Sequence, residues 1–136
     1  MKKFLSVLCL TMVLASFLTA AAPLPNTTFN LVQGLPETMN VGDTYTVIVQ
    51  VESDQPFLFA QALPSFQYVG KGVVAVQGGD HAGSDTSATL QITFQAKSPT
   101  TRMYNGMAPV HMVVGVRYPG GYVAVQDYLF NVTVPE

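Results

Sequence analysis

Cysteine is nearly absent from this sequence: the only one among 136 residues is Cys9, inside an uncharged apolar run near the N-terminus. If that run is removed, the remaining protein has no thiol, which excludes a disulfide or a cysteine-ligated metal. A core of this size can hold a fold without a covalent link. Tryptophan is absent altogether, so a carbohydrate-binding platform would lack its commonest aromatic component.

Charged residues are scarce as well, at 10% of the chain against 49% hydrophobic residues, a balance far from that of a disordered chain. Without Lys2 and Lys3, four basic residues remain against eight acidic ones, a net charge of −4. Such a surface repels phosphate groups instead of neutralising them. We therefore expect no nucleic-acid partner, and an anionic membrane surface is disfavoured.

The N-terminus has the pattern of a secretory signal peptide. Lys2 and Lys3 give a basic start, residues 4–18 form an uncharged apolar run, and residues 20–22 are small alanines. This order of basic, apolar and small residues is typical of a helical segment that is removed on export. We expect a signal peptide at residues 1–22 and a secreted, periplasmic or cell-surface protein.

A retained membrane anchor is the alternative for this segment, because the uncharged stretch approaches the roughly 20 residues that a spanning helix needs. Pro23 and Pro25 follow the alanines and favour processing over a continuing helix. Contact with a membrane is expected only if the segment is retained. The rest of the chain, residues 23–136, has the length of a single domain.

Beyond residue 23 apolar and polar residues alternate, and turn residues recur about every ten positions. This pattern predicts seven to nine short antiparallel strands in an all-β sandwich of two sheets. The clearest strands are expected at residues 44–52, 87–96, 110–118 and 122–134. Weaker strands are expected at residues 29–32, 37–41, 57–63, 66–69 and 72–77.

The last two strands are predicted to form a hairpin, because Pro119, Gly120 and Gly121 supply a tight reversal. Burial of the valines in the final strand then requires a change of parity. Val123 and Val125 share one face, whereas Phe130, Val132 and Val134 share the other. We expect a β-bulge near Gln126 and Asp127 to reconcile the two halves.

Residues 35–47, which read LPETMNVGDTYTV, resemble the entry into the second strand of bacterial extracellular immunoglobulin-like modules. There a Gly-Asp turn, here Gly42 and Asp43, precedes an alternating Val/Thr strand. Residues 130–135 are similar to the final strand of the same modules. The resemblance implies an immunoglobulin-like β-sandwich and an adhesive, spacer or accessory role. It implies a fold more than an activity.

One candidate site is a cluster of soft ligands, Met103, Met107 and His111. Thioether and imidazole groups suit monovalent copper, so the cluster suggests an exported copper-binding protein. The alternative is packing. His111 and Met112 are adjacent on a predicted strand and face opposite sides, which places Met112 in the core as a filler residue.

A second candidate is the loop of residues 78–85, in which Asp80, Asp85 and backbone oxygens could hold a hard cation such as calcium. Only two carboxylates are local, and the spacing matches no standard calcium loop. His81 and Ser84 complete a Ser-His-Asp set, but such triads are assembled in space and not within a few residues of sequence. A polar connection between strands is the simpler interpretation.

Tyr118 and Tyr122 flank the Pro-Gly-Gly reversal and form a possible interaction tip for a protein or a sugar. The alternative is a cross-strand pair that fixes the register of the hairpin.

No base, nucleophile and oxyanion donor can be named together, so we expect a protein that is not an enzyme and needs no cofactor. Low charge and few lysines leave the sheet edges poorly protected. We therefore expect a non-enzymatic module that acts through protein contacts or in the cell envelope, by binding a partner or itself through sheet edges. The alternative function is copper binding by the Met/His cluster.

Overall fold

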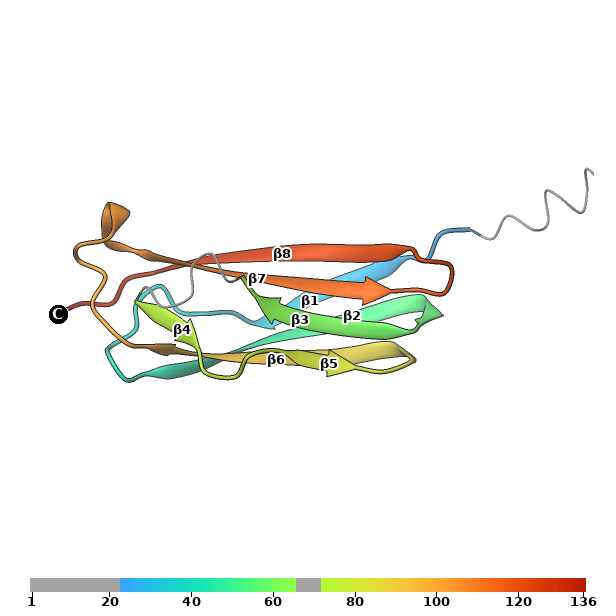
Figure 1. Ribbon diagram of the computed structural model, residues 1–136, viewed down its shortest axis with the longest axis horizontal. Coiled ribbons are helices and arrows are strands. Elements are labelled where there is room, and N and C mark those ends of the chain that lie inside the picture. Colours follow the sequence, from blue (N-terminus) through green and yellow to red (C-terminus); the bar gives the residue numbers. More distant parts are fainter. Residues whose placement is uncertain (1–22, 66–71) are drawn as a thin grey trace, which may run out of the picture.

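The computed structural model describes residues 23–65 and 72–136, which form two four-stranded antiparallel β-sheets packed face to face (Figure 1). The described chain begins at one end of the sandwich and ends at the opposite end. Residues 1–22 and the strand expected at residues 66–69 lie outside the described residues. Within the described ranges, no helix has the length and apolar character needed to cross a bilayer.

In the first sheet the two central strands are the longest, whereas in the second sheet an outer strand is as long as the longer central one. The order of the first sheet is β1 (Thr27–Gln33), β2 (Thr44–Phe57), β6 (Asp85–Ala96) and β4 (Val73–Ala75). The order of the second is β5 (Asp80–Ala82), β3 (Phe59–Pro64), β7 (Ala108–Arg117) and β8 (Val123–Val132). A single 3-10 turn, η2 (Tyr104–Gly106), lies between β6 and β7.

The strand order is that of an immunoglobulin-like sandwich. If the strands other than β5 are lettered along the chain, the first sheet reads A-B-E-D and the second reads C-F-G. β5 then adds one short strand at the outer edge beside β3. The expected all-β, immunoglobulin-like architecture is confirmed.

The core lies between the sheets and is made by alternate residues of the long strands. In β2, Val47, Val49 and Val51 are fully buried, and they face buried valines of β7 such as Val114 and Val116. Burial of one such side chain contributes about 1.5–3 kcal/mol. The alternation read from residues 44–52 and 87–96 is therefore confirmed, and both strands extend beyond those ranges as β2 and β6.

Between β1 and β2, which both belong to the first sheet, the chain touches the second sheet after the end of β8. The backbone N–H of Thr133 donates to the carbonyl of Glu37 (2.8 Å), and the N–H of Met39 donates to the carbonyl of Thr133 (3.0 Å). Together they form an isolated parallel bridge between Thr38 and Thr133. The strand expected at residues 37–41 is wrong, because only this bridge forms before the turn at Gly42.

β8 pairs with β7 in one continuous register, so the β-bulge expected near Gln126 and Asp127 is wrong. Val123 and Val125 are not buried; they are 48% and 56% exposed on the outer side of the sheet. With these two valines facing outward, Ala124, Tyr128 and Phe130 pack against the core without a change of parity. The hairpin between β7 and β8 is confirmed, with Gly120 and Gly121 both at positive φ.

The remaining sequence predictions are met at different lengths. The strands expected at residues 29–32, 57–63, 72–77, 110–118 and 122–134 correspond to β1, β3, β4, β7 and β8. The polar connection expected at residues 78–85 contains a short strand, β5, which pairs with β3.

Candidate functional site

The outer surface of the second sheet is unusually apolar. Because side chains alternate along a strand, the residues of β3, β7 and β8 that do not enter the core point to solvent on this surface. An antiparallel sheet that is wet on one side ordinarily carries polar residues there. Six large apolar residues lie there among the polar ones, and we call these six the apolar face: Phe59, Leu63, Val113, Val123, Val125 and Leu129.

A shallow depression of about 350 Å³ lies on the apolar face, over the central strand β7. Gly115 lies in its lining, where the absence of a side chain leaves room. A Cβ atom at this position would meet no other atom within 4 Å, so packing of the fold does not demand glycine here. A glycine inside a strand often marks the close approach of a ligand or another backbone. The lining residues are Phe59, Gln61, Leu63, Val113, Gly115, Val116, Arg117 and Val123.

Polar side chains also lie within this surface: Arg117 lies between Phe59 and Val123 in the register, and Asp127 lies opposite Val113. The imidazole of His111 lies 3.6 Å from the carboxylate of Asp127 across β7 and β8. The ring of His81 stacks on Phe59 with a centroid distance of 5.7 Å. Arg117 is exposed beside the depression. Arg117 and Asp127 carry opposite charges, so this surface is neither strongly acidic nor strongly basic.

The outer surface of the first sheet has the opposite character. Its two central strands, β2 and β6, present polar side chains to solvent, and the hydroxyls of Thr46 and Thr93 share a hydrogen bond of 2.9 Å. Ile48 is the apolar exception on these strands and is half-buried. The polar residues include Thr44, Thr46, Gln50, Glu52, Thr89, Gln91, Thr93 and Gln95. The apolar face is therefore a property of one sheet and not of the whole surface.

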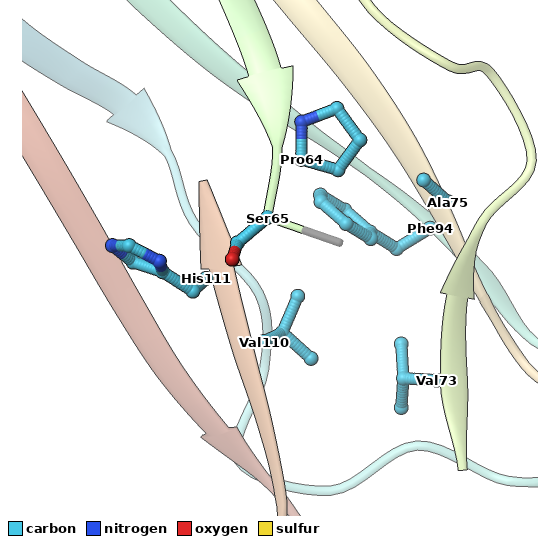
Figure 2. Close-up of a pocket in the computed structure, with 7 residues that line it drawn as sticks. All are labelled: Pro64, Ser65, Val73, Ala75, Phe94, Val110 and His111. Atoms are coloured by element: carbon cyan, nitrogen blue, oxygen red, sulfur yellow. The ribbon is translucent and has the colours of Figure 1, made fainter. Parts of the chain in front are cut away.

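Between the sheets, a small pocket opens near the end of β3 (Figure 2). Figure 2 shows Val110 and Val73 directed into the space between the sheets, whereas the imidazole of His111 lies on the other side of β7. The volume of about 10 Å³ is close to that of one water molecule, so this pocket is too small for an organic ligand.

The three residues of the soft-metal hypothesis lie in different surroundings. Met103 packs against the hydrophobic core from the loop before β7. His111 projects from the outer side of β7, next to Asp127. Met107 is half-buried directly before β7. The described part of the chain also contains no group of three or more His, Cys, Asp or Glu side chains that could hold a metal ion. Copper binding by the Met/His cluster stays a prediction.

The carboxylates of the 78–85 segment are engaged in local hydrogen bonds. Asp80 accepts one from the backbone N–H of His81 and another from that of Gln91, both at 2.9 Å. Asp85 accepts one from the backbone N–H of Thr86 at 2.7 Å. Because Gln91 lies in β6 and Asp80 in β5, the Asp80 carboxylate joins the two sheets. These contacts account for the acidic residues without an ion.

The two tyrosines of the β7–β8 hairpin differ in exposure. Tyr118 is 1% exposed and points into the protein, whereas Tyr122 is 38% exposed. Their rings lie 5.9 Å apart, and the backbone N–H of Tyr118 donates to the carbonyl of Tyr122 at 2.8 Å. Of the two rings in the expected interaction tip, only Tyr122 is available to a partner. Binding at this tip stays a prediction.

The fold and its surfaces define the class of protein: an immunoglobulin-like β-sandwich with one polar and one apolar outer surface. No protein-family model matches the sequence, and a search of curated proteins finds no relative. Among solved structures, the chain is similar to E. coli alpha-2-macroglobulin in its native conformation, with 20% identity and a TM-score of 0.46 over 85% of this chain. The chain spans about 7% of the length of that protein.

Two further solved structures are similar over most of both chains. One is self-complemented MyfA, the major subunit of Myf fimbriae from Yersinia enterocolitica, at 10% identity and a TM-score of 0.46, with 82% of this chain and 99% of that chain covered. The other is murine CRIg, at 12% identity and a TM-score of 0.33, with 84% of this chain and all of that chain (100%) covered. The likeness at such identities is one of fold.

Proposed function

We propose that this protein is an exported, non-enzymatic module that binds a partner protein through the apolar face. The contrast between the two outer surfaces carries the proposal, because the same fold exposes threonine and glutamine on one sheet and large apolar residues on the other. Contiguous apolar surface on a small protein is typical of a contact that another molecule covers.

The chemistry of the face defines the kind of partner. Arg117 and Asp127 give it one charge of each sign, so electrostatic attraction to a strongly charged partner is weak. The depression over Gly115 is shallow and suits an inserted apolar side chain. The partner is therefore a protein with a nearly neutral surface that projects one or two apolar side chains.

Photo-cross-linking in the producing cells tests this proposal. p-Benzoylphenylalanine in place of Leu63, within the apolar face, is expected to give one discrete cross-linked product. The added substitution Val113→Lys, on the strand position opposite Leu63, is expected to abolish that product. The control places the photoreactive residue at Thr89 on the polar surface, with Gln91→Lys as the control charge. Equal products from both surfaces, or none from position 63, would refute the proposed function.

Export is the second part of the proposal and rests on the pattern of residues 1–22. Mass spectrometry of the protein recovered outside the cytoplasm gives its molecular mass, which shows whether these residues have been removed. We expect a product that begins near Pro23. Recovery of the intact chain from the membrane fraction would favour the retained anchor instead.

A further inference from the structure

Among the described strands, β8 is the longest sheet edge without a protective feature. β4 and β5 have three residues each, and the register of β1 is interrupted between Leu31 and Gln33. β8 has ten residues in a continuous register and contains no proline, no lysine and one charged residue, Asp127. Short length, bulges, prolines and lysines are the usual defences of an edge, and β8 has none of them.

The direction of the β8 backbone groups follows from bonds at its two ends. At one end the carbonyl of Tyr122 accepts from Tyr118, toward β7, and at the other both backbone groups of Thr133 point away from β7, to residues 37–39. Backbone groups of successive residues point to opposite sides of a strand. In this continuous register, the odd-numbered residues therefore direct N–H and C=O to the open edge: Val123, Val125, Asp127, Leu129 and Asn131.

In the part of the chain that the structure describes, this edge has little cover. Residues 37–39 protect it only at Thr133. Between Val123 and Leu129 one edge carbonyl has a partner, that of Asp127, which accepts a hydrogen bond of 3.1 Å from the exposed side chain of Gln126. Such a side chain is easily displaced by an incoming strand.

We propose that β8 pairs in an antiparallel manner with β8 of a second copy of this chain, around a two-fold axis at Gln126. The inference deepens the proposed function, on which it rests, because it assigns a second contact to the same sheet. A two-fold contact needs a surface that is complementary to itself, and antiparallel pairing of one strand with its copy meets this need. The resulting sheet would continue through eight strands and bring two apolar faces side by side.

Charge and shape select the register of this pairing. Residues whose backbone N–H and C=O groups point to the open edge must lie opposite each other in the pair. The alignment centred on Asp127 would place this residue opposite Asp127 of the other copy, where like charges repel. A shift of the two-fold axis to Tyr128 would bring the other copy's Val123 opposite Thr133. The backbone groups of Thr133 are already bonded to residues 37–39. The opposite shift avoids both conflicts. It pairs Val123 with Leu129 and Val125 with Asp127, and brings the two copies of Gln126 together.

Single-cysteine cross-linking of the full chain in a Cys9→Ser background tests this register. In Gln126→Cys the two thiols face each other across a non-hydrogen-bonded pair, whose Cα separation of about 4.5 Å is within the disulfide range. We expect this variant to form a disulfide dimer at least about tenfold faster than Tyr128→Cys or Thr89→Cys, for which the same register places no matching thiol opposite. Faster cross-linking at Tyr128→Cys, or equal rates at all three positions, would overturn the proposal.

Sedimentation of the unmodified chain provides the second measurement. We expect a concentration-dependent dimer that Val125→Pro abolishes, because the Val125 N–H points to the edge and its loss leaves the β7 ladder intact. If circular dichroism shows that Val125→Pro is unfolded, Val125→Lys replaces it. A monomer at millimolar concentration, or a dimer unaffected by either variant, would overturn the pairing. Photo-cross-linking from position 63 needs no dimer, so failure of the pairing is distinguishable from failure of the proposed function.

Discussion

The phenolic hydroxyl of Tyr118 donates a hydrogen bond to the hydroxyl of Ser53 at 2.7 Å and thereby joins the end of β7 to β2 in the opposite sheet. The same phenol oxygen lies 2.6 Å from the Thr27 hydroxyl in β1. Ser53 in turn donates to the carbonyl of Gln55 at 2.7 Å. Because the Tyr118 ring is buried, this chain of hydroxyls links three strands from inside the sandwich.

Removal of the Tyr118 hydroxyl leaves two partner hydroxyls without their contact. We expect Tyr118→Phe to lower the free energy of unfolding by about 1–3 kcal/mol, the range for a partly buried hydrogen bond that is lost from one side. Urea denaturation followed by circular dichroism measures the change. Tyr122→Phe is the control, because its hydroxyl is outside this chain of bonds, and its effect is expected to be small. Equal effects of the two substitutions would contradict the structural role of Tyr118.

Gly34 is required by a close approach to Phe130. A Cβ atom on Gly34 would lie 2.9 Å from an edge carbon of the Phe130 ring, shorter than carbon atoms normally approach. We expect Gly34→Ala to destabilise the protein by about 1–3 kcal/mol through this overlap. In a Phe130→Leu background the same substitution is expected to cost less. Gly83→Ala is the matched control, because its added methyl group meets nothing within 4 Å. Thermal unfolding that shows the same cost in both backgrounds would exclude the contact as the cause.

The partial burial of Tyr128 predicts that the protein loses stability in alkaline solution. Burial raises the pKa of Tyr128 above 10.0, the ordinary value for tyrosine. The unfolded chain therefore loses this proton at a lower pH than the folded one, and folding becomes less favourable as the pH rises past about 10. Urea midpoints measured below and above this pH should fall more in the wild type than in Tyr128→Phe. An identical fall in both would show that other groups govern the alkaline transition.

A titration with cuprous ion tests the metal alternative. Because Met103 packs against the core and His111 lies on the outer side of β7, we expect the wild type and the double variant Met103→Leu, Met107→Leu to bind the ion equally weakly. Tight binding that the double variant loses would establish a soft-metal site in place of the packing role.

The fold could be predicted from the sequence wherever only one side of a strand is apolar. In β6, Leu90, Ile92 and Phe94 alternate with polar residues, so the side that enters the core is evident. β8 offers no such signal, because Val123 and Val125 compete with Tyr128 and Phe130 for the core. The paired strand decides between them, and its register is a tertiary property.

The apolar face could not be predicted from the sequence for a related reason. Its residues come from three strands, β3, β7 and β8. The order of those strands in the sheet depends on how they pair, which the sequence of a single strand does not show. Gly115 was the available local signal, since a glycine within a run of valines is unfavourable for a strand and calls for an explanation. β5 was missed because Asp80, His81 and Ala82 have little preference for a strand, and pairing with β3 supplies their order.

Residues 27–39 serve as the outermost strand of one sheet and as the final bridge of the other. Cleavage that trims the chain past residue 39 would therefore uncover β2 and lengthen the open margin of β8 in a single event. If β8 pairs as proposed, such a truncated molecule would present two long open strand edges, β2 and β8, and chains of molecules joined through both edges would become possible.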